Sequence, residues 1–223
     1  MQDQRAELDW REGGVPVSVR FDDPYFSLDD GLAETRYVFL EGNRLPDRFL
    51  PGFHVAELGF GTGLNFLATW AAWEAAGVEG PLRFTSFEAF PMARDEMVRA
   101  LDAFSELESL ASRLLEVWRP EGGAFDLGSA QLTVITGDAR DALPGWDGRA
   151  DAWYLDGFSP AKNPELWEET LLTEVGRHTA PSGTVATYTA AGFVRRGLAA
   201  AGFTVERRPG FGRKRHMTVG VLA

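Results

Sequence analysis

Hydrophobic and polar positions alternate in a regular order from residue 54 to the end of the chain. Short apolar runs predict strands, and longer stretches with apolar residues at helical spacing predict helices. The predicted strands are 54–60, 82–90, 130–138, 150–158, 184–192, 203–210 and 215–223. The predicted helices between them are 63–77, 92–104, 106–118, 164–183 and 193–202. This order predicts an α/β fold with one doubly wound, mostly parallel sheet, in which the last strand is antiparallel.

The first 50 residues have a different pattern. Residues 15–21 alternate between apolar and polar types and predict a strand, and residues 36–43 predict another. The segment between them is rich in acids and turn-forming residues. We therefore expect residues 1–50 to form a small β-element with an active-site loop. Residues 51–223 are expected to form a Rossmann-like domain.

Composition narrows the class of protein. The 223 residues include 44% hydrophobic residues, no cysteine and three histidines, and no two histidines are spaced as a metal-ligand pair. No stretch approaches the roughly 20 apolar residues that span a bilayer. We therefore expect a cytoplasmic protein with no metal site and no membrane contact. The net charge of −11 repels nucleic acid, so any RNA binding requires a local basic patch.

Four carboxylates come at the ends of predicted strands: Glu57, Glu88, Asp138 and Asp156. The carboxyl ends of parallel strands meet at one edge, where ligands bind in such sheets. Any one of these acids could instead cap a helix or lie in a solvated loop. The occurrence of all four at one edge favours a ligand site.

A glycine turn follows the first of these strands, with Gly59, Gly61 and Gly63 at alternate positions. Glu57 precedes it and would oppose a phosphate, which argues against a dinucleotide. It suits the ammonium group of S-adenosylmethionine, directly or through water. Glu88 is then placed to bind the ribose hydroxyls and Asp138 to bind the adenine amino group. The alternative for the turn alone is a tight strand-to-helix connection.

Five long motifs carry a resemblance to a known family: FDDPYFSLDDGLAETRYVFLEGN, AELGFGTGLNFL, FEAFP, DGFSPAKNPELW and AGFVRRGLAAAGF…GFGRKRHM. The chain resembles the methyltransferase half of MnmC, a bifunctional family of tRNA-modification enzymes. The resemblance implies a class I methyltransferase fold. It also implies methyl transfer from S-adenosylmethionine to the aminomethyl group on carbon 5 of the wobble uridine. The family's flavin-dependent oxidase part has no counterpart in this sequence, so the resemblance is to a stand-alone form that binds no FAD.

The residues themselves suit transfer to an amine. An aliphatic amine has a pKa near 10 and arrives mostly protonated. A carboxylate beside the methyl group can bind the ammonium and take its proton, and Asp156 is the predicted catalytic residue. Phe158 is available to stack on a flipped base and Pro160 to shape the turn. The alternative for Asp156 is a helix cap.

The remaining predicted contacts are with substrate. Tyr25 and Phe26 are expected to lie over the sulfonium or to stack on the uracil, unless they only anchor their loop. Lys162 and Asn163 are expected to contact the RNA backbone in the anticodon region, or to lie in a solvated loop. A predicted phosphate-binding patch comprises Arg195, Arg196, Arg213, Lys214 and Arg215. Two rival functions stay open: an amine methyltransferase acting on a small molecule or protein, and a non-catalytic scaffold that binds S-adenosylmethionine.

Overall fold

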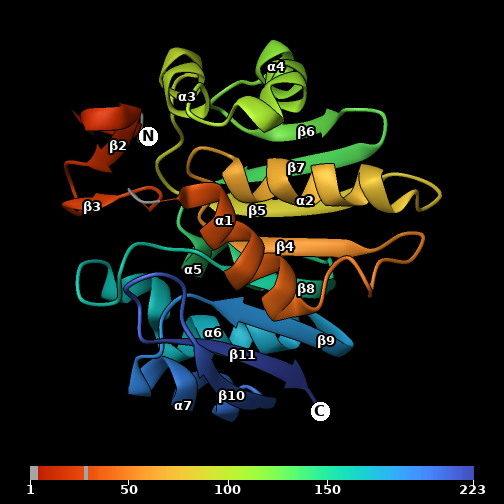
Figure 1. The fold of residues 1–223 in the computed structure, drawn as a ribbon. Helices are drawn as coiled ribbons and strands as arrows, with labels where there is room; N and C mark the ends of the chain where they lie inside the picture. Colours follow the sequence, from red (N-terminus) through yellow and green to blue (C-terminus); the bar gives the residue numbers. More distant parts are fainter. Residues whose placement is uncertain (1–4, 28–29) are drawn as a thin grey trace.

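An eight-stranded sheet forms the centre of the structure, a computed structural model that describes residues 5–27 and 30–223 (Figure 1). Its strand order is β10-β11-β9-β8-β4-β5-β7-β6. The strands are β4 (His54–Leu58), β5 (Leu82–Glu88), β6 (Gly123–Asp126), β7 (Ala130–Thr136), β8 (Ala150–Leu155), β9 (Thr179–Thr187), β10 (Phe203–Pro209) and β11 (His216–Leu222). The pairings β5–β7, β4–β5, β4–β8 and β8–β9 are parallel. The last strand, β11, runs antiparallel to both neighbours, which confirms the predicted fold class.

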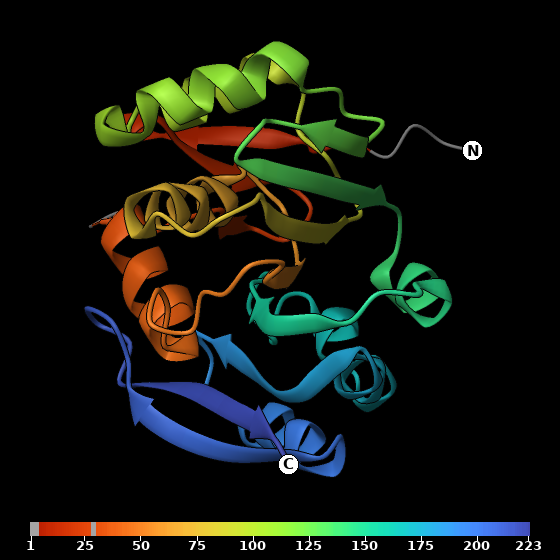
Figure 2. The same cartoon turned by 90° about the vertical axis from the view of Figure 1, so that its right-hand side faces the viewer.

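Helices cover both faces of this sheet (Figure 2). One face carries α1 (Gly31–Thr35) and α2 (Leu64–Ala76), and α3 (Arg94–Leu101) and α4 (Glu108–Val117) pack near them. The other face carries α5 (Ala139–Ala142), α6 (Glu169–Arg177) and α7 (Gly192–Ala200). Successive residues of a strand point to opposite faces. Tyr154 therefore packs in the core under α2, and its neighbour Trp153 packs in the core under α6.

A second, smaller sheet lies beyond the carboxyl ends of the central strands (Figure 1). It consists of β1 (Leu8–Arg11), β2 (Val15–Ser18) and β3 (Asp23–Pro24) in antiparallel order. The predicted strand at 15–21 is β2, and the small N-terminal β-element is confirmed. The following segment packs into the main core through Phe39 and Phe49. A domain boundary at residue 50 stays a prediction.

Two predicted elements are wrong. Residues 36–43 are helical, with a π-helical turn at Arg36–Leu40 and a 3₁₀ turn at Glu41–Asn43. Their short apolar run is buried on the central sheet, and such a run does not distinguish a strand from a buried helical turn.

The helix predicted at 164–183 begins with a separate 3₁₀ turn, Pro164–Trp167, and α6 ends at Arg177. Residues 179–183 begin β9, where a register irregularity opposite β8 accommodates Pro181.

His54, at the start of β4, lies at the edge of the sheet opposite the small sheet. Its side chain is buried, Nε2 bonds the Thr85 hydroxyl at 2.9 Å, and Nδ1 is buried without a hydrogen-bond partner. Burial, reinforced by the nearby positive charge of Arg83, lowers the pKa of His54 to about 4. The folded state therefore favours the neutral ring.

We expect His54 to make folding sensitive to mild acid. In the unfolded chain the ring takes up a proton near pH 6.5, but in the folded chain it does so only near pH 4. Its contribution is present above pH 6.5 and is lost as the pH falls towards 4, by about 3 kcal/mol in all. Urea unfolding of the protein and of His54→Leu between pH 4.5 and 7.5 measures this. The free energy of unfolding of the wild-type protein, relative to that of His54→Leu, should rise with pH. A pH-independent difference would contradict the assignment.

Candidate active site

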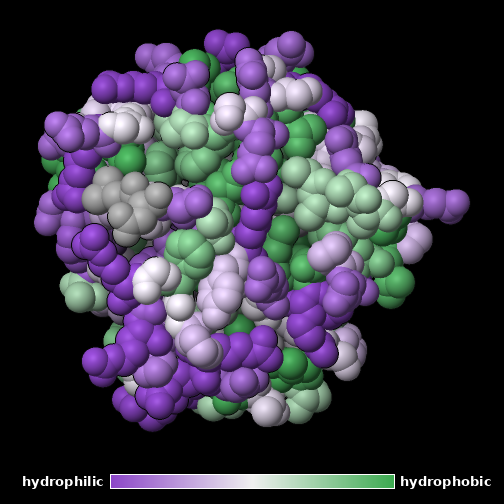
Figure 3. All heavy atoms as spheres, in the orientation of Figure 1, coloured by the Kyte–Doolittle hydropathy of each residue, from purple (hydrophilic) through white to green (hydrophobic). Residues whose placement is uncertain are grey.

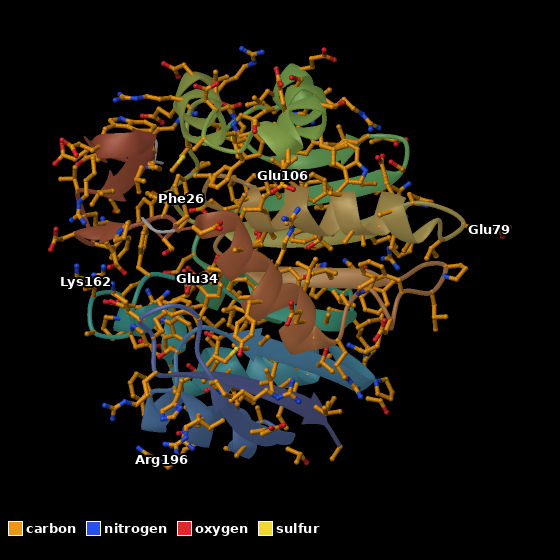
Figure 4. All side chains as sticks on the ribbon, viewed as in Figure 1. Phe26, Glu34, Glu79, Glu106, Lys162 and Arg196 are labelled. Carbon is orange, nitrogen blue, oxygen red and sulfur yellow. The ribbon has the colours of Figure 1, made fainter. Side chains whose placement is uncertain are left out.

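A cavity of about 610 Å³ opens at the carboxyl ends of the parallel strands. Its walls come from the small sheet, the glycine turn after β4, the segments after β5, β7, β8 and β9, and the loop between β10 and β11. Figure 4 shows Phe26, Glu34 and Lys162 on this side of the molecule. The volume is in the range of small-molecule sites.

The glycine turn forms the floor of the cavity by close approach of the backbone. Gly59 has φ +93°, and a Cβ there would lie 2.6 Å from the carbonyl oxygen of Asp156. Gly61 has φ +54°, and a Cβ there would lie 3.0 Å from the ring of Tyr25. Gly63 also has a positive φ, of +79°, and directly precedes α2. Side chains at these three positions would be strained, and at Gly59 and Gly61 they would also meet neighbouring groups of the cavity wall.

Glu88, the last residue of β5, lies on this floor with its carboxylate already oriented. Its Oε2 accepts the Gly61 backbone N–H at 2.8 Å, and its Oε1 accepts the Phe90 backbone N–H at 2.7 Å. Burial raises the pKa of Glu88. Each oxygen keeps a second lone pair for a ligand hydroxyl. This geometry fits the predicted contact with a ribose diol.

Asp138 also lines the cavity, but it is held by a neighbouring arginine. It caps the N-terminus of α5 and forms an ion pair with Arg140, with Nη2 2.6 Å from Oδ2. Arg140 lowers the pKa of Asp138. The predicted contact with an adenine amino group stays a prediction, and it would share the carboxylate with Arg140.

Glu57 lies behind the cavity rather than on it. Its carboxylate is fully buried, accepting the Ser86 hydroxyl at 2.7 Å and the Asn65 amide at 2.9 Å. Burial raises its pKa to about 8. Asn65 lines the cavity and Glu57 is not among the described residues that do. Glu57 has no exposed surface in this structure, and its predicted contact with a ligand ammonium, directly or through water, stays a prediction. Sequence reasoning missed Asn65.

Asp156 follows β8 and lines the cavity with a half-buried carboxylate. Its Oδ2 accepts the Asn65 amide at 2.6 Å. Burial raises its pKa to about 7, and Lys214 partly opposes this. Among the described residues, no side chain or backbone group donates to Oδ1. Oδ1 of Asp156 is therefore available to substrate, and Asp156 stays the catalytic candidate.

Aromatic rings line the same cavity as this carboxylate. Phe158 stacks on Phe21 with ring centroids 4.8 Å apart and meets Tyr25 edge to face at 5.0 Å. All three line the cavity, as does Phe26, which packs against Phe104. Phe21 was not predicted. These rings offer apolar faces to a base or a sulfonium.

The turn after Asp156 has the geometry expected of a proline turn. Pro160 follows Ser159, whose carbonyl accepts the Lys162 backbone N–H at 2.8 Å. Pro160 is not among the described cavity residues, so its predicted part is limited to shaping the turn, whereas Asn163 lines the cavity.

The two lysines predicted to contact RNA are turned towards carboxylates of the protein. Lys162 Nζ lies 3.3 Å from Asp22 and 3.5 Å from Asp23, and it also donates to the Asp22 backbone carbonyl. Lys214 Nζ lies 2.6 Å from Glu34 and 4.3 Å from the centre of the Tyr188 ring. Both lysines hold the cavity wall together in this structure.

The arginines lie at the same edge of the sheet as the cavity. Arg195 is half-buried and Arg196 exposed on α7, which begins after the carboxyl end of β9. Arg213 and Arg215 are exposed on the β10–β11 loop. β10 is parallel to β9, so this loop follows a strand end at the same edge. The part of the surface over α7 and β10 is largely hydrophilic (Figure 3).

A family model of S-adenosyl-L-methionine-dependent methyltransferases matches residues 105–223, which include Asp138 and Asp156. The chain belongs to this family. The described part of the methyltransferase has no helix long and apolar enough to cross a membrane. It also has no group of three or more histidine, aspartate and glutamate side chains that could hold a metal ion.

Curated relatives extend the similarity over the whole methyltransferase. A protein from Aeromonas hydrophila is 49% identical over 98% of this chain, which corresponds to 35% of that protein. One from Pseudomonas aeruginosa is 47% identical over 97% of this chain and 35% of that protein. Both are named tRNA 5-methylaminomethyl-2-thiouridine biosynthesis bifunctional protein MnmC. The chain thus spans about a third of the length of these relatives.

A solved structure supports the same relationship. The crystal structure of MNMC2 from Aquifex aeolicus matches with a TM-score of 0.77 and 26% sequence identity. The match covers 99% of this chain and 72% of that chain. It includes the small sheet and the glycine turn as well as the part that the family model matches.

We expect Glu88→Ala to weaken binding of S-adenosylmethionine by at least about tenfold, because the variant cannot form charge-assisted hydrogen bonds to two hydroxyls. Calorimetry with the purified protein measures the affinity. Glu106→Ala is a matched control, because Glu106 is an acid on the surface that pairs with Arg36. An unchanged affinity in Glu88→Ala would refute the assignment of Glu88.

Proposed function

We propose that the methyltransferase transfers a methyl group from S-adenosylmethionine to the aminomethyl nitrogen of 5-aminomethyl-(2-thio)uridine at the tRNA wobble position. The product is 5-methylaminomethyl-(2-thio)uridine. The observation that carries the chemistry is the Asp156 carboxylate, which has one oxygen held by Asn65 and lines a cavity that is also lined by aromatic rings. The relatives named for tRNA 5-methylaminomethyl-2-thiouridine biosynthesis support the choice of substrate.

The charge of the cavity suits an amine. Among the described side chains that line it, six are acids, including Glu34, Glu88 and Asp156, and four are lysine or arginine. The substrate amine arrives as an ammonium, which cannot attack a methyl group until it loses a proton. Asp156 binds that ammonium through Oδ1 and accepts a proton from it, which leaves a neutral nitrogen held in place. S-adenosylmethionine, when bound over the glycine turn and Glu88, supplies the electrophilic methyl group on its sulfonium.

The aromatic cluster suits the base that carries the amine. Phe158 and Phe21 present rings beside Asp156, and single-stranded bases bind proteins by stacking on such rings. A wobble uridine turned out of the anticodon loop would stack there and direct its carbon-5 substituent to Asp156. Tyr25 closes the side of the same space, with its hydroxyphenyl ring against Phe158 and Gly61.

The arginines at this edge suit the RNA backbone. An acidic protein of net charge −11 can bind RNA only where basic side chains gather. Arg213 lines the cavity, and Arg195, Arg196 and Arg215 lie on the α7 and β10–β11 segments at the same side of the sheet. All four are proposed to contact phosphates of the anticodon region. An enzyme for a small amine has no use for such a group of arginines, which is why tRNA is preferred over a small-molecule substrate.

We expect Asp156→Asn to bind S-adenosylmethionine normally and to reduce turnover at least about a hundredfold, because a positioned proton acceptor is removed. Single-turnover methylation of tRNA that lacks the modification, followed by nucleoside analysis, measures this. Full activity of the variant at saturating tRNA would show that Asp156 is not catalytic. A wild-type protein that leaves this tRNA unmethylated would refute the proposed function.

We expect Arg196→Ala with Arg215→Ala to weaken tRNA binding and to reduce the log–log salt slope by up to about two units, one for each phosphate that these arginines neutralise. Turnover at saturating tRNA should change little. Arg177→Ala is the matched control, since Arg177 is exposed at the opposite edge of the sheet and pairs with Glu174. Equal salt slopes for the double variant and the wild-type protein would place RNA binding elsewhere.

A further inference from the structure

Asn65 occupies the centre of a buried polar network beneath the glycine turn. It is the second residue of α2, and its exposed fraction is 5%. Its Nδ2 donates to Glu57 Oε1 at 2.9 Å and to Asp156 Oδ2 at 2.6 Å. Its Oδ1 accepts the Thr35 hydroxyl at 2.9 Å. The amide therefore joins the buried acid of β4 to the cavity acid that follows β8.

The partners of Asn65 determine which way its amide faces. The two ends of an amide have nearly the same shape, so only hydrogen-bond partners distinguish them. Reversal would place Oδ1 against two carboxylate oxygens and the NH₂ group against the Thr35 hydroxyl. The observed orientation gives an oxygen of each acid a donor, whereas a reversed amide would leave the Asp156 carboxylate without one among the described residues.

The same contact selects which oxygen of Asp156 meets the substrate. The backbone of Asp156 is fixed, because its N–H donates to the Leu58 carbonyl at 3.1 Å and its own carbonyl lies against Gly59. With Oδ2 held by Asn65, rotation of the carboxylate is restricted. Oδ1 is left for the amine.

We propose that Asn65 is a positioning residue for methyl transfer: its amide holds Oδ2 of Asp156 and so presents Oδ1 as the acceptor for the substrate ammonium. This inference rests on the proposed function for the identity of the amine. It assigns Asn65 no contact with the reacting atoms.

The Asn65 amide also affects the pKa of Asp156. The ionisable groups that face Asp156 come from four elements: Glu57 on β4, Glu34 on α1, Tyr188 after β9, and Lys214 in the β10–β11 loop. Burial raises the pKa of Asp156 to about 7, while the Asn65 donor and Lys214 lower it. Without Asn65, a larger fraction of Asp156 would be protonated at neutral pH, and that fraction could not accept a proton from the substrate.

The first experiment needs no RNA. The side-chain carboxyl carbon of Asp156 is followed by NMR in protein labelled with ¹³C-aspartate, with the resonance assigned by its disappearance in Asp156→Asn. In Asn65→Leu, whose side chain has similar size but no donor, Asp156 should titrate about one pH unit higher than in the wild-type protein. Thr35→Val is the matched control, because it removes a hydroxyl from the same network without removing the donor to Asp156. It should shift the titration by less than about 0.3 pH unit.

The second experiment uses the reaction. The acidic limb of the pH profile of kcat/KM, measured with unmodified tRNA, should move upward in Asn65→Leu by the same amount as the Asp156 titration. Asn65→Ser, which leaves room for water, should move both in the same direction and serves if Asn65→Leu does not fold. A profile lowered evenly at all pH values, with an unshifted Asp156 titration, would overturn the proposal and leave Asn65 a structural residue.

Two further outcomes are distinguishable. If affinity for S-adenosylmethionine falls as much as turnover while the Asp156 titration is unchanged, Asn65 belongs to the cofactor site and the proposal fails. If the wild-type protein does not methylate the tRNA, the proposed function fails instead. The NMR titration still decides whether Asn65 controls the ionisation of Asp156.

Discussion

The crowding of carboxylates at one edge of the central sheet is the constraint on which the rest of the site depends. Burial raises the pKa of Glu57 to about 8 and of Asp156 to about 7. Each acid accepts hydrogen bonds from nearby donors: Glu88 from backbone N–H groups, Glu57 from the Ser86 hydroxyl and the Asn65 amide, and Asp156 from the same Asn65 amide. The glycine turn supplies one of these N–H groups and lets a ligand come close. A ligand carrying a sulfonium and an ammonium complements the negative charge that remains.

The walls of the cavity are held by ion pairs between distant parts of the chain. Lys162 joins the loop after β8 to Asp22 and Asp23 of the small sheet, about 140 residues earlier. Lys214 joins the β10–β11 loop to Glu34, 180 residues earlier. Each lysine is well exposed, so neither pair adds much to stability on its own. They connect segments that are distant in the sequence around one cavity.

The parts of the structure that follow from short stretches of sequence, namely the sheet and its strand ends, were predicted from the sequence. Alternation of strands and helices indicated the sheet, and the meeting of parallel strand ends pointed to Glu88 and Asp156. The helical turns at 36–43 were mistaken for a strand, because a short buried apolar run has no distinguishing period. The edge strand Gly123–Asp126 was missed, since it is short, mostly exposed and begins at a glycine with φ +112°. The lysine pairings and the Asn65 network arise from contacts between distant segments, which no local pattern reports.

Under the proposed function, one substrate must meet opposite charges within a short distance. Phosphates require the arginines of α7 and the β10–β11 loop, whereas the ammonium requires Asp156. A cation free in the cavity would compete with the ammonium for that carboxylate. The Lys214–Glu34 pair lies at this boundary, since Lys214 belongs to the basic loop and also lines the cavity. Glu34 offsets part of the Lys214 charge at close range. The basic loop can therefore border the cavity while the ammonium still meets the carboxylate of Asp156.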